Sequence, residues 1–319
     1  MSDLNYTVEL TAPDIEPYRA GNTGIPYVTT LEAKEPGPHV VVTALTHGNE
    51  ICGAITLDRL FRADIRPRRG RLTLAFNNVA AYREFDPRYP IASRYVDEDF
   101  NRLWHPATLD GPRQSTELAR ARRLRPIIDS ADLLLDLHSM QYATAPLMLA
   151  GLLGRSRELA LRVGIPELIM CDAGHAAGPR MRDYGGFGDP AATKTALLIE
   201  CGQHWERRSA EVSTDVTLRF LIATGSAQPE DLAALAGPDF DAHPRQRIIE
   251  VTEAVTITGD RFDFAGDYRG LEVLGEKGSL IGRDGEREVR TPYDNCVLIM
   301  PSRRLVKGQT AVRLGRYLD

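Results

Sequence analysis

A histidine and a glutamate stand three residues apart in the segment TALTHGNEICGA, residues 43–54, where an apolar run gives way to a helix-like run. His47 and Glu50 could both approach one ion to within about 2 Å from such a loop, because imidazole nitrogen and carboxylate oxygen are common zinc ligands. Ligands of open α/β sheets also bind at the carboxyl ends of strands. The pair alone leaves an alternative open. Glu50 could simply begin the helix, favoured by the helix dipole, and His47 could be a hydrogen-bonded loop histidine.

A second histidine closes another apolar run, ADLLLDLHSM at residues 131–140. We expect His138 at the carboxyl end of a buried strand, with Asp136 on the same face, where it could orient the imidazole ring. Two histidines and a glutamate are a typical set of three protein ligands for a catalytic zinc, which keeps a fourth position open for water. A structural zinc would need a fourth protein ligand, and the four scattered cysteines offer no obvious one. We therefore predict one Zn²⁺ per chain, bound by His47, Glu50 and His138.

A glutamate ends a third apolar run, TALLIECGQHW at residues 195–205. A carboxylate at the end of a buried strand is costly unless it is paired or functional. Near a water whose pKa a zinc ion has lowered to about 7, Glu200 could take the proton as a general base. The alternative is a strand-end acid held in a salt bridge.

With one further motif, these residues resemble the succinylglutamate desuccinylase/aspartoacylase family of the zinc-carboxypeptidase superfamily. That family shows H-x-x-E, D-x-N-R, D-L-H and a strand-end E-x-G in this order. The chain has all four within residues 47–202, namely His47 and Glu50, Asp99-Phe100-Asn101-Arg102, Asp136-Leu137-His138, and Glu200-Cys201-Gly202. The resemblance implies a zinc-dependent amide hydrolase with a β-rich C-terminal module.

The resemblance also implies roles for residues that would otherwise be assigned to a charged, solvated loop. Arg94 matches the arginine that polarises the scissile carbonyl and stabilises the oxyanion. Asn101 and Arg102 match the pair that clamps a substrate carboxylate, a task suited to the guanidinium fork. Asp99 matches an acid that orients the imidazole of His47. The implied reaction is hydrolysis of an N-acyl amino acid, in which Glu200 passes its proton to the departing amine.

A glycine-rich segment, PRMRDYGGFGDP at residues 179–190, precedes the Glu200 strand. The corresponding region of aspartoacylases supplies an arginine and a tyrosine that contact the substrate, so the resemblance makes Arg182 and Tyr184 candidates. Their spacing to the glutamate differs here, which leaves the acyl group open, and the alternative is a flexible lid. His204 could face the cleft or make an ordinary loop hydrogen bond.

Strand-like and helix-like runs alternate over the first two-thirds of the chain. This pattern predicts an α/β fold with a mostly parallel mixed sheet flanked by helices, as in zinc carboxypeptidases. Ser115 is a plausible N-cap, and Pro126 should kink or shorten its helix. The predicted strands are 39–45, 71–77, 132–138 and 195–200, and the predicted helices are 50–61, 115–129, 155–164 and 211–224.

A change of composition predicts the domain organisation. Residues 225–246 are rich in Pro, Gly and Asp, and the runs beyond them alternate between apolar and polar residues. We therefore expect a catalytic domain at 1–224, a linker at 225–246, and a small barrel-sandwich-like all-β module at 247–319. This module could cover part of the cleft or mediate self-association into a homo-oligomer.

Bulk composition narrows the class of protein. With 43% hydrophobic and 26% charged residues, the chain is an ordinary globular protein, and its net charge of −5 with no Lys/Arg-rich block argues against a nucleic-acid partner. The scattered cysteines suit reduced thiols, and we find neither a signal peptide nor an apolar run of roughly 18 residues. These features predict a cytoplasmic protein with no membrane partner.

Three functions fit these observations to different degrees. The leading hypothesis is a deacylase whose partner is a small N-acyl amino acid with a free carboxylate. The alternative within enzymes is a metallocarboxypeptidase acting on short peptides, which the four motifs also fit. A third hypothesis, disfavoured by retention of the complete residue set, is a metal-binding protein without turnover.

Overall fold

The computed structural model describes residues 7–174, 177–238, 240–303 and 305–318. The chain forms two compact units. The residues up to Glu167 and Gly174–Gln246 make an α/β unit, while Leu168–Ala173 and the residues from Arg247 onward make a C-terminal unit. Residues 225–246 therefore belong to the α/β unit instead of forming the linker that we expected.

Specific contacts explain why this segment is part of the α/β unit. It contains the short helix α7 (Pro229–Leu232), whose Leu232 is fully buried. The guanidinium of Arg68 donates to both carboxylate oxygens of Asp231, at 2.6 and 2.9 Å. The Pro-, Gly- and Asp-rich composition thus correctly indicated a mostly irregular backbone at residues 225–246. It did not reveal that Leu232 and Asp231 attach this segment to the α/β unit.

The α/β unit is built on a mixed sheet with the strand order β1-β3-β2-β4-β7-β5. The four inner strands run parallel to one another, and the two outer strands pair antiparallel to them. The predicted mostly parallel sheet is therefore confirmed. The two outer strands, β1 and β5, were not among the strands predicted from the sequence. The strands are β1 (Val28–Glu32), β2 (Glu35–Ala44), β3 (Arg69–Phe76), β4 (Leu133–Met140), β5 (Leu147–Leu149) and β7 (Thr195–Gln203).

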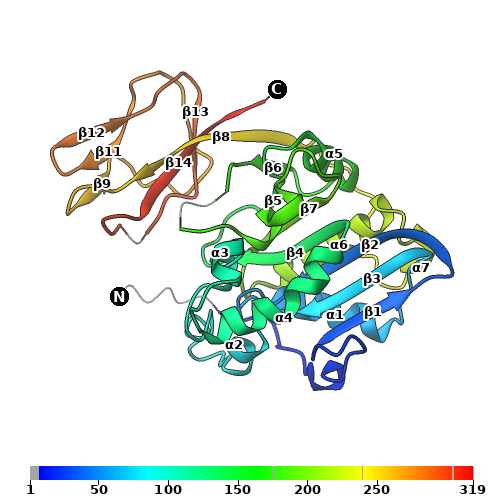
Figure 1. Cartoon of the computed structure of the whole chain (residues 1–319). Coiled ribbons are helices and arrows are strands. Elements are labelled where there is room, and N and C mark those ends of the chain that lie inside the picture. The colour runs from blue at the N-terminus through cyan, green and yellow to red at the C-terminus, as the bar shows by residue number, and fades with distance from the viewer. Residues whose placement is uncertain (1–6, 175–176, 239, 304, 319) are drawn as a thin grey trace. The chain divides into compact units, whose positions relative to one another are not determined.

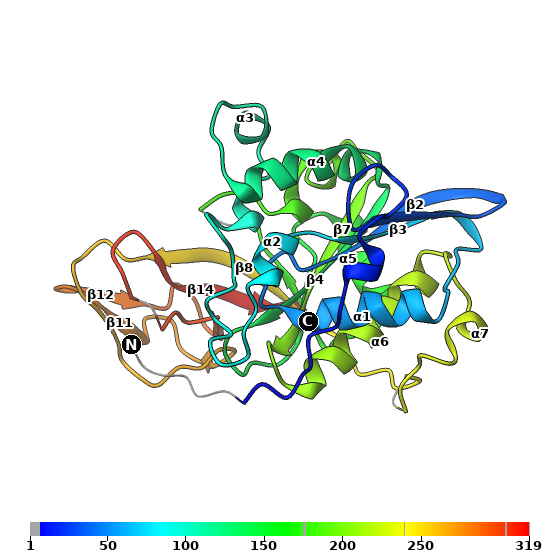
Figure 2. The ribbon, with the colours of Figure 1, turned by 90° about the horizontal axis from the view of Figure 1, so that it is seen from below.

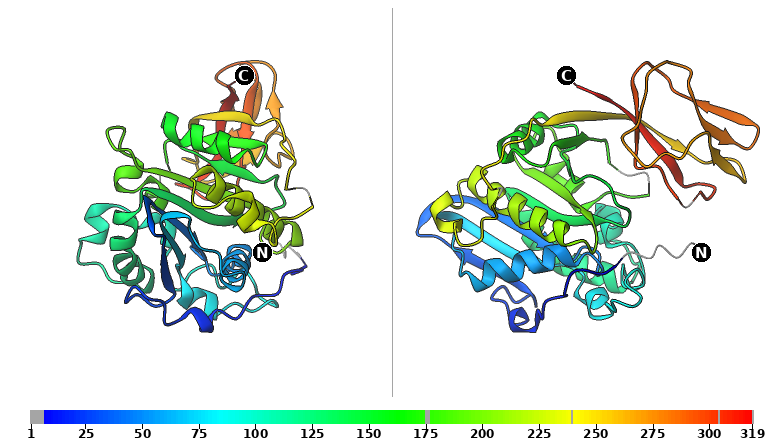
Figure 3. Two further views of the ribbon diagram at one scale, coloured as in Figure 1. Left: turned by 90° about the vertical axis from the view of Figure 1, so that its right-hand side faces the viewer. Right: turned by 180° about the vertical axis from the view of Figure 1, so that it is seen from behind.

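Helices cover both faces of this sheet, as Figure 2 shows from below. On one side lies α4 (Thr116–Ser130), and on the other lie α1 (Ile51–Arg62), α5 (Gly154–Val163) and α6 (Arg207–Ala223), which pack against one another. The right-hand view of Figure 3 shows α1 and α6 lying across the strands. Within the described residues, no helix is long and apolar enough to cross a membrane.

The longest predicted helices are found, with one difference in α4. Ser115 caps that helix as predicted, since its Oγ accepts a hydrogen bond from the backbone N–H of Leu118 at 3.0 Å. The helix continues through Pro126 to Ser130, so the expected shortening is wrong. Proline removes a single backbone hydrogen bond, and burial of Leu124 and Ile128 on either side of it holds the helix against the sheet.

The C-terminal unit is all-β, which confirms the predicted small β module (Figure 1, yellow to red). One set of strands has the order β6-β8-β14-β13-β10, and a separate antiparallel sheet has the order β12-β11-β9. Its core contains Ile257, Phe262, Ile281, Leu298 and Leu314. The strands are β6 (Leu168–Cys171), β8 (Arg247–Thr256), β9 (Phe262–Phe264), β10 (Val273–Leu274), β11 (Leu280–Asp284), β12 (Arg287–Arg290), β13 (Cys296–Ile299) and β14 (Thr310–Tyr317).

Candidate metal centre and catalytic site

Two strand ends and one helix start bring the predicted ligands together. β2 ends at Ala44 and is followed by the loop that carries His47, whereas His138 lies near the end of the neighbouring parallel strand β4. Glu50 is the N-cap residue of α1, but its side chain makes no capping hydrogen bond. Its carboxylate therefore does not act as a simple helix cap.

A glycine lets this loop pack tightly. A Cβ on Gly48 would lie 2.4 Å from the carbonyl carbon of Ala81 and 2.5 Å from the carbonyl oxygen of Ser93. The Gly48 N–H donates to the backbone carbonyl of Arg94 at 3.1 Å. Absence of a side chain at position 48 thus allows the segment carrying Arg94 to lie directly beside His47.

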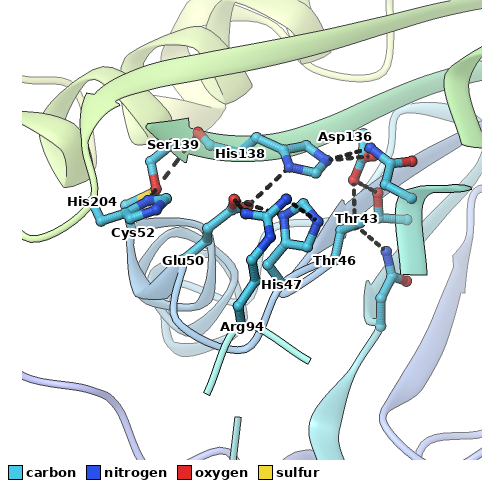
Figure 4. Close-up of polar contacts among 12 residues, drawn as sticks. Thr43, Thr46, His47, Glu50, Cys52, Arg94, Asp136, His138, Ser139 and His204 are labelled. Atoms are coloured by element: carbon cyan, nitrogen blue, oxygen red, sulfur yellow. Dashed lines mark hydrogen bonds and ion pairs between the residues drawn. The ribbon is translucent and has the colours of Figure 1, made fainter. Parts of the chain in front are cut away.

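The donor atoms of His47, Glu50 and His138 all lie within 4.8 Å of one another, and all three side chains are buried. Nδ1 of His47 is 2.7 Å from Glu50 Oε1, and Nδ1 of His138 is 2.8 Å from Glu50 Oε2. Figure 4 shows both rings turned toward this carboxylate. Among the described residues no hydrogen bond of good geometry reaches the buried Glu50 Oε2, although His138 Nδ1 lies close to it. A buried carboxylate with one imidazole nitrogen facing each oxygen fits a cation, so these residues could hold a metal ion.

The far nitrogen of each ring is held by a carboxylate. His47 Nε2 lies 3.0 Å from Asp99 Oδ1, and His138 Nε2 lies 2.7 Å from Asp136 Oδ2. If each Nε2 carries the proton and donates it to its carboxylate, each Nδ1 presents a lone pair toward Glu50. This arrangement is typical of metal-binding histidines.

Asp136 is itself fixed by two threonines. Its Oδ1 accepts hydrogen bonds from the hydroxyls of Thr43 and Thr46, both at 2.8 Å, and Asn77 Nδ2 donates to Thr46 Oγ1 at 2.9 Å. Sequence reasoning did not single out these residues. A threonine inside the apolar run HVVVTAL was the available indication, because Thr43 pairs directly with Asp136 across parallel strands.

The charges of the cluster favour a cation. Burial alone would raise the pKa of Glu50, but the adjacent His47 and His138 hold it well below its usual range. Burial likewise opposes protonation of His138, yet Asp136 and Glu50 raise its pKa well above the ordinary value. Without a metal, the carboxylates draw a proton onto the imidazole of His138. A divalent cation would replace that proton, so metal binding should be accompanied by proton release.

Glu200 lies beside His138, since the two residues are paired across the parallel strands β4 and β7. Paired residues of neighbouring strands point to the same face of the sheet. Burial raises the pKa of Glu200 to about 8, and the negative charge of Glu50 contributes in the same direction. Its Oε2 is buried without a hydrogen-bond partner among the described residues. The carboxyl group is therefore able to exchange a proton near neutral pH.

Arg94 reaches the same cluster (Figure 4). Its Nη2 lies 3.0 Å from Asp99 Oδ2 and 2.9 Å from His47 Nε2. A ring nitrogen cannot donate to Asp99 and accept from Arg94 at once. Arg94 is also ion-paired with the two acids of the cluster, since its Nη1 lies 3.8 Å from Glu50 Oε1.

Asn101 and Arg102 lie on a short 3₁₀ turn, Phe100–Arg102, next to this cluster. Asp99 caps the turn by accepting the Asn101 N–H at 2.9 Å, so one carboxylate positions both the turn and His47. Asn101 is buried, and its Nδ2 lies 3.3 Å from His138 Nε2 while its Oδ1 accepts the Met181 N–H at 2.9 Å. Arg102 donates to the backbone carbonyl of Asn101 at 2.7 Å.

The glycine-rich segment forms 3₁₀ turns at Met181–Asp183 and Gly185–Phe187. Arg182 is buried, and its Nη1 donates to Asp183 at 2.7 Å. Tyr184 packs in a core cluster beside Trp104, and its hydroxyl accepts a hydrogen bond from Arg125 of α4 at 2.9 Å. The structure engages Tyr184 in packing against α4, and the contact of Tyr184 with substrate stays a prediction.

His204 makes a specific hydrogen bond in the interior. Its Nδ1 lies 2.7 Å from the Ser139 hydroxyl, a contact drawn in Figure 4. Burial lowers the pKa of His204 to about 3, so the ring is neutral. Of the two alternatives weighed for this residue, the hydrogen bond is found. Cys201, next to Glu200, is fully buried, as expected for a small apolar side chain.

Comparisons with known proteins agree with this geometry. Residues 36–165 match the model of the succinylglutamate desuccinylase/aspartoacylase catalytic domain, which confirms the resemblance inferred from the motifs. No curated protein matches the chain.

Solved structures share the fold over most of their length. Succinylglutamate desuccinylase from Vibrio parahaemolyticus is 17% identical with a TM-score of 0.67, covering 92% of this chain and 87% of its own. A succinylglutamate desuccinylase/aspartoacylase from Rhodobacter sphaeroides is 18% identical, with a TM-score of 0.61 and coverage of 92% and 89%. The product-bound ectoine utilization protein EutE (DoeB) from Ruegeria pomeroyi is 17% identical, with a TM-score of 0.59 and coverage of 91% and 88%.

Proposed function

This chain belongs to the succinylglutamate desuccinylase/aspartoacylase family through residues 36–165, and we propose that it is a zinc-dependent hydrolase of N-acyl amino acids. The observation that carries the proposal is the convergence of His47, Glu50 and His138 on one buried point, with Glu200 paired beside His138. A three-ligand set with an acid–base group at its side is the arrangement that metal-assisted amide hydrolysis requires.

In the proposed reaction, different residues of the chain would have different roles. Zinc held by the three ligands would supply Lewis acidity, which makes water more acidic and polarises a carbonyl oxygen. Glu200 would take the proton of the attacking water and return it to the nitrogen of the leaving amine. Arg94 would donate hydrogen bonds to the carbonyl oxygen as negative charge develops on it. Asp99 and Asp136 would keep the two imidazoles in the required tautomer.

Substrate recognition is assigned to the turn that follows Arg94. Asn101 and Arg102 would bind the free carboxylate of the amino-acid part of the substrate, where a guanidinium can form paired hydrogen bonds. Asn101 would have to exchange its present partners for the substrate, whereas Arg102 would have to release a backbone carbonyl. Arg182 stays a candidate for the acyl end. The cytoplasmic location, the absence of a nucleic-acid partner and self-association stay predictions from the sequence.

The proposal is tested by assaying amine release from a panel of N-acetyl and N-succinyl amino acids and short peptides. The chain is first loaded with zinc, its metal content is measured, and each substrate is offered with and without chelator. Cleavage of an N-acyl amino acid that chelator abolishes is the expected result. Chelator-sensitive cleavage of peptides alone would favour a metallocarboxypeptidase. No release by a chain carrying one zinc would contradict the proposed hydrolysis.

A further inference from the structure

A surface cavity of about 240 Å³, open to solvent, lies in the α/β unit between α4 and the short helix α2 (Val79–Arg83), where Arg123 is exposed and Arg120 is half-buried. Its charged lining residues are all arginines, namely Arg83, Arg120 and Arg123. Thr116, Arg120 and Arg123 follow one another at helical spacing, so they lie on one face of α4. None of the residues assigned to the metal centre lines this cavity.

Two of these guanidinium groups have no acidic partner. Arg120 donates Nε to the carbonyl of Asn77 and Nη2 to the carbonyls of Pro26 and Phe76, at 2.7 to 3.0 Å. These neutral acceptors fix the side chain but do not balance its charge. Among the described residues, Arg123 has neither a hydrogen bond nor an ion pair, and it faces Arg120 closely enough to repel it.

Three carboxylates bond to the lining from outside it, and all three are already engaged. One of them, Glu117, accepts a hydrogen bond from Asn78 Nδ2 at 3.0 Å and three more from backbone N–H groups. Glu16 accepts hydrogen bonds from Arg83 and from the Tyr27 hydroxyl, each at 2.7 Å, so it balances the third arginine. Asp97 accepts the backbone N–H of Thr116 at 2.7 Å. The cavity therefore keeps the charge of Arg120 and Arg123 in a chain whose formal net charge is −5.

The electrostatic cost of this arrangement is visible in the structure. Burial, and then the positive charge of Arg123, lower the pKa of Arg120 to about 10. A cavity lined by charge of one sign concentrates the opposite ion, and arginines bind phosphate and carboxylate groups through paired hydrogen bonds. An anion between the two guanidinium groups would turn repulsion into attraction.

We propose that this arginine-lined cavity binds a small oxyanion with two or more negative charges. Arg123 supplies the free guanidinium, and Arg120 supplies a second one that its backbone acceptors hold in place. Phosphate groups and dicarboxylates share the required chemistry. The site lies outside the catalytic machinery, so its occupation does not depend on the proposed hydrolysis.

Isothermal titration of the zinc-loaded chain with inorganic phosphate, and separately with succinate, tests the proposal at constant ionic strength set with chloride. The variants are Arg123→Gln, which removes the free charge, and Arg123→Lys, which keeps it. Arg162→Gln is the matched control, because Arg162 is an exposed arginine on α5. Circular dichroism and thermal melts check that each variant is folded.

We expect saturable binding of at least one anion by the wild type, with Arg162→Gln unchanged. Arg123→Gln should bind at least tenfold more weakly, which corresponds to about 1.4 kcal/mol, and Arg123→Lys should keep most of the affinity. Phosphate without succinate would identify a phosphate site, and the reverse a dicarboxylate site. Binding that is equal in the wild type and Arg123→Gln, as expected for anions at the zinc, would overturn the proposal. Failure of both anions to bind saturably would overturn it too.

Discussion

At the scale of single residues, the site depends on which ring nitrogen each histidine presents. Asp99 and Asp136 bind the two Nε2 atoms, so both Nδ1 atoms face Glu50. A carboxylate that holds the outer nitrogen sets the tautomer and makes the inner nitrogen a better ligand. We therefore propose separate tasks for the acids of the site, with Glu50 binding metal, Asp99 and Asp136 orienting the imidazoles, and Glu200 carrying a proton.

Replacing Glu200 by glutamine should remove the proton carrier and leave the ligands intact. We expect kcat for the cleaved N-acyl amino acid to fall by about 10² to 10⁴, with zinc content still one per chain. Stopped assays of amine release and metal analysis measure the two quantities. The exposed acid Glu158 provides the control, since Glu158→Gln should leave both unchanged. Near-normal turnover by Glu200→Gln would assign the proton transfer to another group.

Replacing Asp136 by asparagine should weaken the metal site itself. The amide cannot accept the His138 proton and both threonine hydroxyls with the strength of a carboxylate. We expect zinc affinity to fall about 10- to 100-fold, as measured by competition with a chelating dye. A variant that binds zinc as tightly as the wild type would show that Asp136 does not orient the ligand.

At the scale of elements, one buried glutamate links α4 to the segment that carries Arg94 and Asp99. Glu117 is fully buried and accepts the backbone N–H groups of Val96, Asp97 and Glu98, together with Asn78 Nδ2. Within the described residues, only the oxygens of Glu117 accept the N–H groups of this turn, and they are supplied by a helix on one face of the sheet. The position of Arg94 thus depends on the packing of α4.

Glu117→Gln should therefore destabilise the α/β unit. An amide group turns an N–H₂ toward at least one of the donors, leaving buried N–H groups without an acceptor at a cost of about 1 to 3 kcal/mol each. Urea unfolding of the variant should show a correspondingly lower free energy of unfolding, with Glu158→Gln unaffected. An unchanged midpoint would mean that the turn is held by other contacts.

A buried histidine at the start of β2 should make stability depend on pH. His39 Nε2 lies 2.7 Å from Thr73 Oγ1, and burial, followed by the charge of Arg71, lowers the pKa of His39. Because the folded protein disfavours the charged ring, its contribution is complete above the unfolded value of about 6.5 and is lost as pH falls below it. The zinc-loaded wild type should thus lose stability on acidification more steeply than His39→Gln. If the free energy of unfolding of the two proteins fell equally with falling pH, the expected contribution of His39 would be wrong.

At the scale of the whole molecule, the two units should respond differently to metal. All three proposed ligands belong to the α/β unit, whereas the C-terminal unit has its own apolar core and a carboxylate, Asp284, that accepts the N–H groups of Thr258 and Gly259. Each unit therefore has the means to unfold by itself.

Calorimetry should accordingly resolve a zinc-sensitive and a zinc-insensitive transition. Free zinc at 100 times its Kd adds about 2.7 kcal/mol to the α/β unit, so chelation should lower that transition alone. Asp284→Asn should lower only the other. One transition that moves in both experiments would show that the units unfold together, and a scan insensitive to chelator would contradict the metal site.

Short-range patterns in the sequence determined much of this protein. Apolar runs fixed the four inner strands, and helical periodicity with Ser115 as a cap fixed α4, because hydrophobic spacing and capping act within a few residues. Four ordered motifs predicted the resemblance that the family model matches over residues 36–165, and three residues that converge on one buried point able to hold a metal ion. In an open α/β sheet, the ends of neighbouring parallel strands meet at one edge, so the convergence followed from the strands themselves.

Only the tertiary structure revealed the side-chain contacts between segments that are far apart in the sequence. Four hydrogen bonds join residues that are far apart in the chain. They run from Arg68 to Asp231 in segment 225–246, from Arg125 of α4 to Tyr184, and from Thr43 and Thr46 to Asp136. The hydrogen bonds of Glu117 and the lining of the arginine-lined cavity also bring together residues from distant segments. Side-chain partners of this kind depend on how helices and strands pack, and local sequence preference carries no information about that packing.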